Sequence, residues 1–180
     1  MRVRMLAATV AVVVLAGWPG GARPAAADAG GSTCRFSFYA SLSPGLSPQP
    51  GSGTITTGGP SGTIDCSGPV NGSSPAGRGM LGIEARYGVG HPNGCASGIT
   101  GDGDGSGTST MSVPTSSGVQ DISQGFTFTF GGKPPGNGGL VAGDFRGERF
   151  SGSFDITPTE GDCITAPVTK VHVTGTGFLH

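Results

Sequence analysis

The chain has 180 residues, of which 37 are glycine and 14 are proline, and only 12% are charged. Its formal net charge is −1 and it has no basic patch, which argues against a nucleic-acid partner and against binding to anionic membrane surfaces. A chain of this length suits one domain with a substantial hydrophobic core.

The first 27 residues, Met1–Ala27, have the pattern of a secretory signal peptide. Two arginines precede an apolar run, and Ala25–Ala27 supply the small residues that signal peptidase recognises, so we expect cleavage before Asp28. The run is shorter than the roughly 20 residues of a membrane span, although an uncleaved anchor is the alternative. Residues 28–180 should form one domain without tryptophan. Because three of the ten basic residues precede Asp28 and all eleven acidic residues remain, its net charge is 7 − 11 = −4.

In chain order, apolar and polar residues alternate repeatedly, which predicts β-strands because successive side chains of a strand point to opposite faces. The alternation is clearest in Leu140–Cys163, where Phe150, Phe154 and Ile156 share one face. The other expected strands are Cys34–Leu42, Thr54–Thr57, Gly62–Val70, Met80–Val89, Thr108–Val113, Phe126–Phe130 and Val168–Leu179.

Loops rich in proline and glycine separate these strands, and no segment after the leader has apolar residues at helical spacing. Glycines within strands, such as Gly152 and Gly175, suit a strongly curved sheet. The sequence therefore predicts an all-β fold of eight or nine strands. It is either a closed antiparallel barrel or a two-sheet sandwich, held by two disulfides.

Four cysteines follow the leader: Cys34, Cys66, Cys95 and Cys163. An even number of cysteines in an exported chain predicts two disulfides, and three pairings are possible. We favour Cys66–Cys95, which would join neighbouring strands, and Cys34–Cys163, which would tie the first strand to the start of the last. The sequence has no CxxC pair, and its histidines are not at ligand spacing, which argues against zinc.

The glycine-rich run 101–107 is a candidate calcium site. Asp102, Asp104 and Ser106 occupy positions one, three and five of an EF-hand-like loop, with glycine at position six, and such oxygen ligands suit calcium. Position twelve is Val113, where an EF-hand has a bidentate glutamate. A flexible acidic loop is the simpler interpretation, and no other cofactor is expected.

Five polar residues are candidate ligand anchors: Tyr39, Arg86, Arg146, Arg149 and His172. Arg146 and Arg149 belong to a charge cluster that could line a barrel, although a solvated strand face explains such a cluster more often. His172 could act as a general base only with a nucleophile, and the sequence has no G-x-S-x-G motif.

The arginine- and alanine-rich leader, the paired cysteines and the run Gly161–Thr169 (GDCITAPVT) resemble small exported β-proteins of actinobacteria, most of them uncharacterised. The resemblance implies secretion. It supplies no catalytic residue.

We therefore expect a secreted, non-catalytic β-domain that binds a small molecule or a protein. The contact surface would be the loops Ser43–Gly53, Pro92–Gly107 and Gly131–Gly139, because a rigid scaffold that presents loops is a common binding design. One alternative is a small secreted hydrolase or isomerase in which His172 and a nearby carboxylate act as acid and base. Another is a protease inhibitor with the region around Cys95 as its contact loop.

Overall fold

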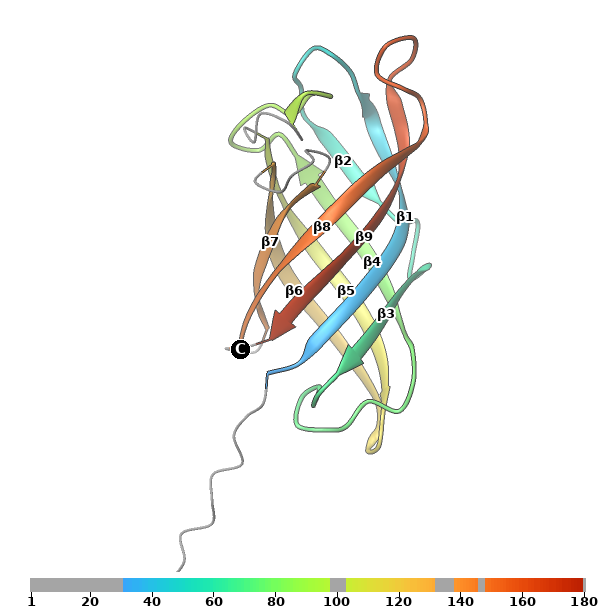
Figure 1. The fold of residues 1–180 in the computed structure, drawn as a ribbon, viewed down its shortest axis with the longest axis vertical. Helices are drawn as coiled ribbons and strands as arrows, with labels where there is room; N and C mark the ends of the chain where they lie inside the picture. The colour runs from blue at the N-terminus through green and yellow to red at the C-terminus, as the bar shows by residue number, and fades with distance from the viewer. Residues whose placement is uncertain (1–30, 98–102, 132–137, 146–147, 180) are drawn as a thin grey trace, which may run out of the picture.

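The computed structural model describes residues 31–97, 103–131, 138–145 and 148–179. Nine strands occur in these ranges: β1 (Thr33–Leu46), β2 (Gly53–Thr56), β3 (Gly62–Ser67), β4 (Gly79–Tyr87), β5 (Asp104–Thr115), β6 (Gly118–Phe130), β7 (Gly138–Phe145), β8 (Glu148–Glu160) and β9 (Val168–Leu179). They form one antiparallel sheet that closes into a barrel where β1 pairs with β9 (Figure 1). No helix within these ranges is long and apolar enough to cross a lipid bilayer.

Two short strands, β2 and β3, share one position between β1 and β4. Ser41 and Ser43 of β1 pair with β2, whereas Thr33–Ser37 pair with β3, and both short strands also pair with β4. Between them the chain turns through the exposed residues Gly58 and Gly59, which have positive φ values of 69° and 119°. The barrel therefore has eight strand positions. That number gives an interior just wide enough for packed side chains or one small ligand.

The structure confirms the all-β prediction and selects the barrel over the sandwich. The hairpin of β5 and β6 is longer than the sequence predicted, since the expected strands ended at Val113 and resumed at Phe126. The intervening residues continue both strands, with a tight turn at 116–117. The alternation of apolar and polar residues between the predicted strands is irregular, because the apolar Val119 points outward, with 63% of its surface exposed, whereas the polar Gln124 is buried.

The structure confirms two disulfides, but the favoured pairing was wrong. The bonds are Cys34–Cys66 and Cys95–Cys163. Cys34 and Cys66 are directly opposite each other on β1 and β3, with Cα atoms 4.0 Å apart. Cys95 follows β4 and Cys163 follows β8, and these loops meet at the other end of the barrel. A Cys66–Cys95 bond would have to span the length of the barrel.

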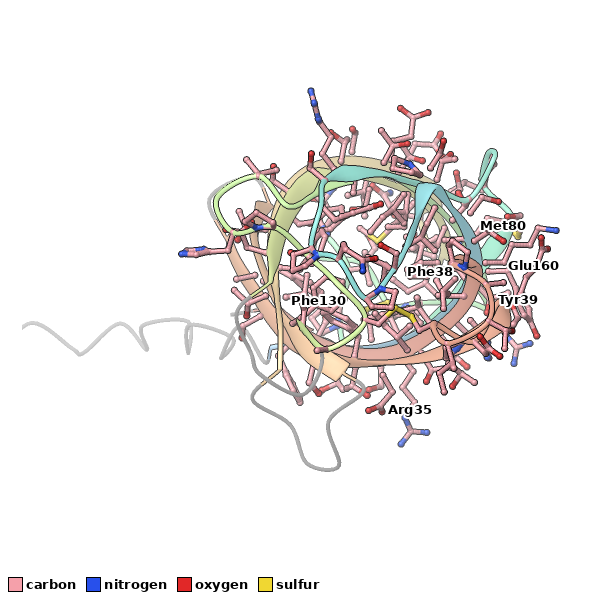
Figure 2. The ribbon with its side chains drawn as sticks, turned by 90° about the horizontal axis from the view of Figure 1, so that it is seen from above. Arg35, Phe38, Tyr39, Met80, Phe130 and Glu160 are labelled. Atoms are coloured by element: carbon pink, nitrogen blue, oxygen red, sulfur yellow. A yellow bond between two sulfur atoms is a disulfide. The ribbon has the colours of Figure 1, made fainter. Side chains whose placement is uncertain are left out.

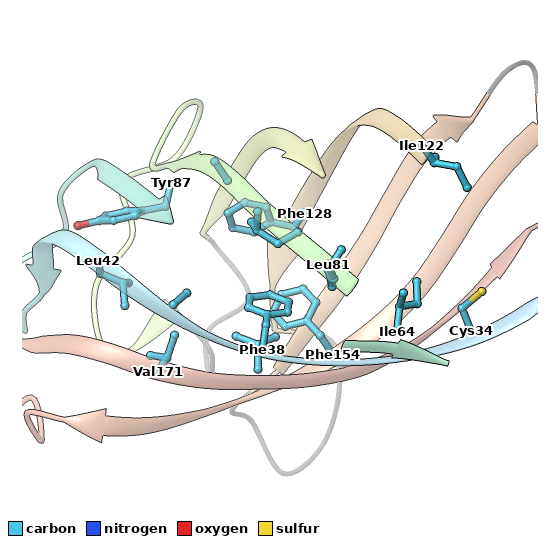
Figure 3. Packing of buried hydrophobic residues seen from close by; sticks show 14 of the residues in the cluster. Cys34, Phe38, Leu42, Ile64, Leu81, Tyr87, Ile122, Phe128, Phe154 and Val171 are labelled. Atoms are coloured by element: carbon cyan, nitrogen blue, oxygen red, sulfur yellow. The ribbon is translucent and has the colours of Figure 1, made fainter. Parts of the chain in front are cut away.

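Apolar side chains fill the interior and polar ones cover the outside. Viewed from above, Phe38 and Phe130 point inward, whereas Arg35, Tyr39 and Glu160 point outward (Figure 2). Phenylalanines from distant strands meet in the centre, where the ring centroids of Phe128 and Phe154 are 6.3 Å apart (Figure 3). The core residues that are buried include Leu42, Ile64, Leu81, Ile83, Tyr87, Ile122, Val171 and Val173.

Several inward phenylalanines lie directly opposite an inward glycine on the next strand. Phe36 pairs with Gly175 across β1 and β9, and Phe128 pairs with Gly105 across β6 and β5. A Cβ atom added at Gly175 would lie only 2.6 Å from Cε2 of Phe36. These glycines thus leave room for aromatic rings in a narrow barrel, which accounts for their positions within strands.

Loops lie at the upper end of the barrel in Figure 1. The segment after β4 lies across the opening (Figure 2), and Asn93 within it is 1% exposed. The Asn93 side-chain amide bonds the backbone of Asp104 at 2.8 and 3.1 Å, and its backbone pairs with Gly51. At the lower end Val70 and Val113 are each 1% exposed.

Candidate ligand-binding cavity

A cavity of about 120 Å³ lies inside the barrel. Its wall is almost entirely apolar, with aliphatic residues such as Ile83, Met111 and Ile122 and the Cys34–Cys66 disulfide. No ionisable side chain of the described residues lines it. The aromatic part of the wall consists of Phe36, Phe38, Phe126, Phe128, Phe130, Phe150 and Phe154.

Two polar residues, Ser109 and Gln124, interrupt this apolar wall. They are 4% and 7% exposed and stand directly opposite each other on β5 and β6. Within the described part of the chain, neither Ser109 Oγ nor Gln124 Oε1 has a hydrogen-bond partner. Leaving a buried polar group unpaired costs about 1–3 kcal/mol, so a pair of such groups inside a core requires an explanation.

The strand register fixes the polar pair in the middle of the barrel. On β6, Gln124 lies two residues from Ile122 and two from Phe126, and all three side chains face inward. Shifting the register by one residue would turn the whole apolar row of β6 outward, so Gln124 cannot leave the interior without unfolding the strand. Ser109 pairs with Ile83 of β4, and Met111 is the next residue of β5 that lines the cavity.

Two of the residues predicted as ligand anchors lie together on the outer face. The ring of Tyr39 stacks on the ring of His172, with centroids 4.5 Å apart, and Ser37 Oγ lies 2.8 Å from His172 Nε2. Tyr39 is 63% exposed. Neither this cavity nor the outer groove described next includes His172, so the structure places the predicted general base outside the barrel interior.

The other predicted anchors are not brought to the interior either. Arg86 borders an open groove on the outer face, together with Glu84, Thr108 and Thr127. Arg146 lies outside the described residues. Arg149 pairs with Asp144 through the backbone of β7 and β8, and its side chain is outside the described part of the chain.

The predicted calcium ligands are not gathered into a site in the described ranges. Asp102 lies outside them, and within them no three His, Cys, Asp or Glu side chains are grouped as metal ligands. Asp104 accepts hydrogen bonds from the backbone N–H groups of Gly90 and His91 and contacts the His91 ring, and Ser106 borders the outer groove. The backbone bonds, more than the imidazole, lower the pKa of the Asp104 carboxyl.

A second carboxylate organises the loop that carries Cys163. Asp162 accepts hydrogen bonds from the backbone N–H groups of Ile164, Thr165 and Ala166, and from the Thr165 hydroxyl. These bonds hold the pKa of Asp162 well below its ordinary value. Both carboxylates therefore stabilise the loops at the upper end of the barrel, remote from the polar pair in its middle.

The chain matches no family model, no curated protein and no solved structure. Ser109 and Gln124 were not predicted as site residues, because polar residues in an alternating pattern are normally assigned to the solvent face. The sequence contained one signal for Gln124. It is two, four and six residues before Phe126, Phe128 and Phe130, which all line the cavity, so in a continuous strand its side chain points to the same face.

Proposed function

We propose that this protein is exported and, without catalysing a reaction, binds a small and largely apolar molecule inside its barrel. The observation that carries the proposal is the apolar cavity with two unpaired polar groups in its wall. Ligand sites are commonly apolar concavities with a few placed polar groups, and eight-stranded barrels can hold one small ligand. The site we propose is therefore the interior, and not the loops.

The cavity volume restricts the size of the ligand. About 120 Å³ is close to the ~150 Å³ of an engineered apolar cavity that binds benzene. It is well below the roughly 300–1,000 Å³ of pockets that hold drug-sized molecules. A single ring or a short chain fits this volume, whereas a lipid does not.

Two features support export. The Met1–Ala27 pattern is that of a signal peptide, and two disulfides, Cys34–Cys66 and Cys95–Cys163, persist in oxidising compartments. The disulfides also favour a preformed site, because one lies in the cavity wall and the other joins two loops at the upper end. A rigid cavity does not have to be ordered by its ligand, which favours binding.

Titration of the oxidised protein with toluene, followed by calorimetry, tests the proposal. Ala85 lines the cavity and Ala142 is exposed on the outer face, so Ala85→Leu and Ala142→Leu add the same atoms to opposite faces of the sheet. We expect saturable binding by the wild type and by Ala142→Leu, and loss of binding in Ala85→Leu. Equal binding by all three proteins, or binding by none, would contradict an interior site.

A further inference from the structure

We propose that the ligand is a neutral aromatic alcohol of the phenol class, whose hydroxyl group lies between Gln124 and Ser109. This inference rests on the proposed function and adds the chemistry of the ligand to it. Three properties of the cavity carry it: the hydrogen-bonding capacity of the polar pair, the absence of ionisable side chains in the described wall, and the aromatic lining and volume of the apolar space around the pair.

A group that both donates and accepts can pair with both of the unpaired atoms at once. Gln124 Oε1 is an acceptor, and the Ser109 hydroxyl can donate or accept. A ligand hydroxyl can donate its hydrogen to Gln124 while its oxygen accepts the hydrogen of Ser109. A ligand carbonyl could pair with Ser109 but would leave Gln124 Oε1 unpaired, and a methyl group would leave both unpaired.

The ligand should be neutral. An ammonium or carboxylate group in this space would be buried without a counter-charge, because no described residue in the wall is ionisable. Burial of an unpaired charge is far more costly than burial of a neutral hydroxyl. The hydroxyl is thus the polar group that this wall accommodates best.

The rest of the ligand should be one aromatic ring. Phe126 is the next inward residue of β6 beyond Gln124, and Phe128 packs edge-to-face on Phe130 and Phe154, at centroid distances of 5.4 and 6.3 Å. Aromatic rings prefer such edge-to-face contacts with one another. A cavity of about 120 Å³ suits a single ring, since a cavity of similar size holds benzene.

The decisive comparison uses phenol and toluene, which differ by a hydroxyl in place of a methyl group. We expect the ratio of phenol affinity to toluene affinity to fall about tenfold or more in Gln124→Met, because the substitution removes the acceptor while keeping a side chain of similar length. Ser109→Ala should lower the same ratio. Ser123→Ala removes an exposed hydroxyl from β6 and should leave the ratio unchanged.

Stability provides a second measurement. Gln124 and Gln120 lie on the same strand, but Gln120 Oε1 accepts a hydrogen bond from Asn71 Nδ2 at 3.1 Å. Replacing Gln124, whose Oε1 is unpaired, by methionine should raise the unfolding temperature of the ligand-free protein by about 2–4 °C. Gln120→Met should lower it or leave it unchanged.

The outcomes separate this inference from the proposed function. A lower phenol-to-toluene ratio in Gln124→Met, together with a higher unfolding temperature, supports the aromatic alcohol. Toluene binding with the same ratio in wild type and Gln124→Met overturns the inference and leaves the proposed function standing. Binding of neither compound by the wild type overturns both. A lower unfolding temperature in Gln124→Met would show that the amide has a structural role, and would also overturn the inference.

Discussion

Polar side chains on the inner face of this barrel differ in their hydrogen-bond pairing from those on the outer face. On the outer face several polar groups pair with one another: Glu160 Oε2 lies 2.6 Å from Lys170 Nζ, and the His172 ring contacts both Ser37 and Tyr39. On the inner face Ser109 and Gln124 have buried atoms without partners among the described residues. The outer pairs are accessible to water and contribute little to stability.

The unpaired inner polar atoms mark a place where the residues present are not those that would give the most stable fold. A hydrophobic residue at position 124 would fill the interior without leaving an unpaired oxygen, so the amide lowers the stability of the ligand-free barrel. Proteins depart from locally optimal choices chiefly at functional sites. We therefore infer that the binding site lies on the inner face at β5 and β6, and not at the outer Tyr39–His172 cluster.

The largest expected contrast compares an inner with an outer aromatic residue. Phe128 is 6% exposed and packs on the rings of Phe126, Phe130 and Phe154, so Phe128→Ala should lower the free energy of unfolding by about 3–5 kcal/mol. Tyr39→Ala removes an exposed ring and should cost about 1 kcal/mol or less. Denaturant unfolding measures both, and similar costs would show that the two faces do not differ.

A smaller contrast compares an inner with an outer glycine. A Cβ atom at Gly175 would lie 2.5 Å from the Ser153 carbonyl oxygen and 2.6 Å from a carbon of Phe36, so Gly175→Ala should cost about 1–3 kcal/mol by overpacking. Gly125 is exposed on the outer face, and the nearest atom to an added Cβ, the Gly107 carbonyl oxygen, would be 4.0 Å away, so Gly125→Ala should be neutral or stabilise by about 0.5–1 kcal/mol. Equal destabilisation by the two substitutions would be inconsistent with ring-over-glycine packing.

The smallest expected effect is the response to acid. The folded-state pKa values of Asp104 and Asp162 are lowered, so their contribution to stability is present above the unfolded-state pKa of about 3.9 and is lost as the pH falls through the folded-state values. Thermal unfolding should therefore show a decline below about pH 4, and Asp162→Asn should reduce that decline.

The affinity for phenol should not follow this pH dependence. It should stay constant between about pH 5 and pH 8, because no ionisable side chain of the described residues lines the cavity, and because the phenol hydroxyl is neutral in this range, as that of tyrosine is. Isothermal titration at several pH values measures it. A pH-dependent affinity in this range would place the ligand near the outer histidines instead.

Much of the architecture could be predicted from the sequence, because alternation is a local property. The alternating row of Phe126–Phe130 and the final strand at Val168–Leu179 were assigned correctly. Closure could not be predicted, since it depends on the pairing of β1 with β9 at opposite ends of the chain. The disulfide pairing failed for the same reason, because Cys66 and Cys95 follow one another in sequence but lie at opposite ends of the barrel.

The candidate site was the least predictable feature. Arg86 and His172 were chosen as polar residues on strands, and polar residues on a barrel normally face water. Gln124 is in step with Phe126, but this spacing indicates an inward position only if the strand extends back through residue 124, which the pairing of β5 with β6 establishes. A pattern that assigns polar residues to the outside necessarily misses the polar group that a ligand site places inside.

The most direct test of the interior site is a search for intermolecular nuclear Overhauser effects between phenol ring protons and the methyl groups of the oxidised protein. We predict contacts to Ile83 and Ile122, which line the cavity on either side of the Ser109–Gln124 pair. Contacts confined to exposed methyl groups such as those of Val119, or no contacts at ligand saturation, would contradict the account.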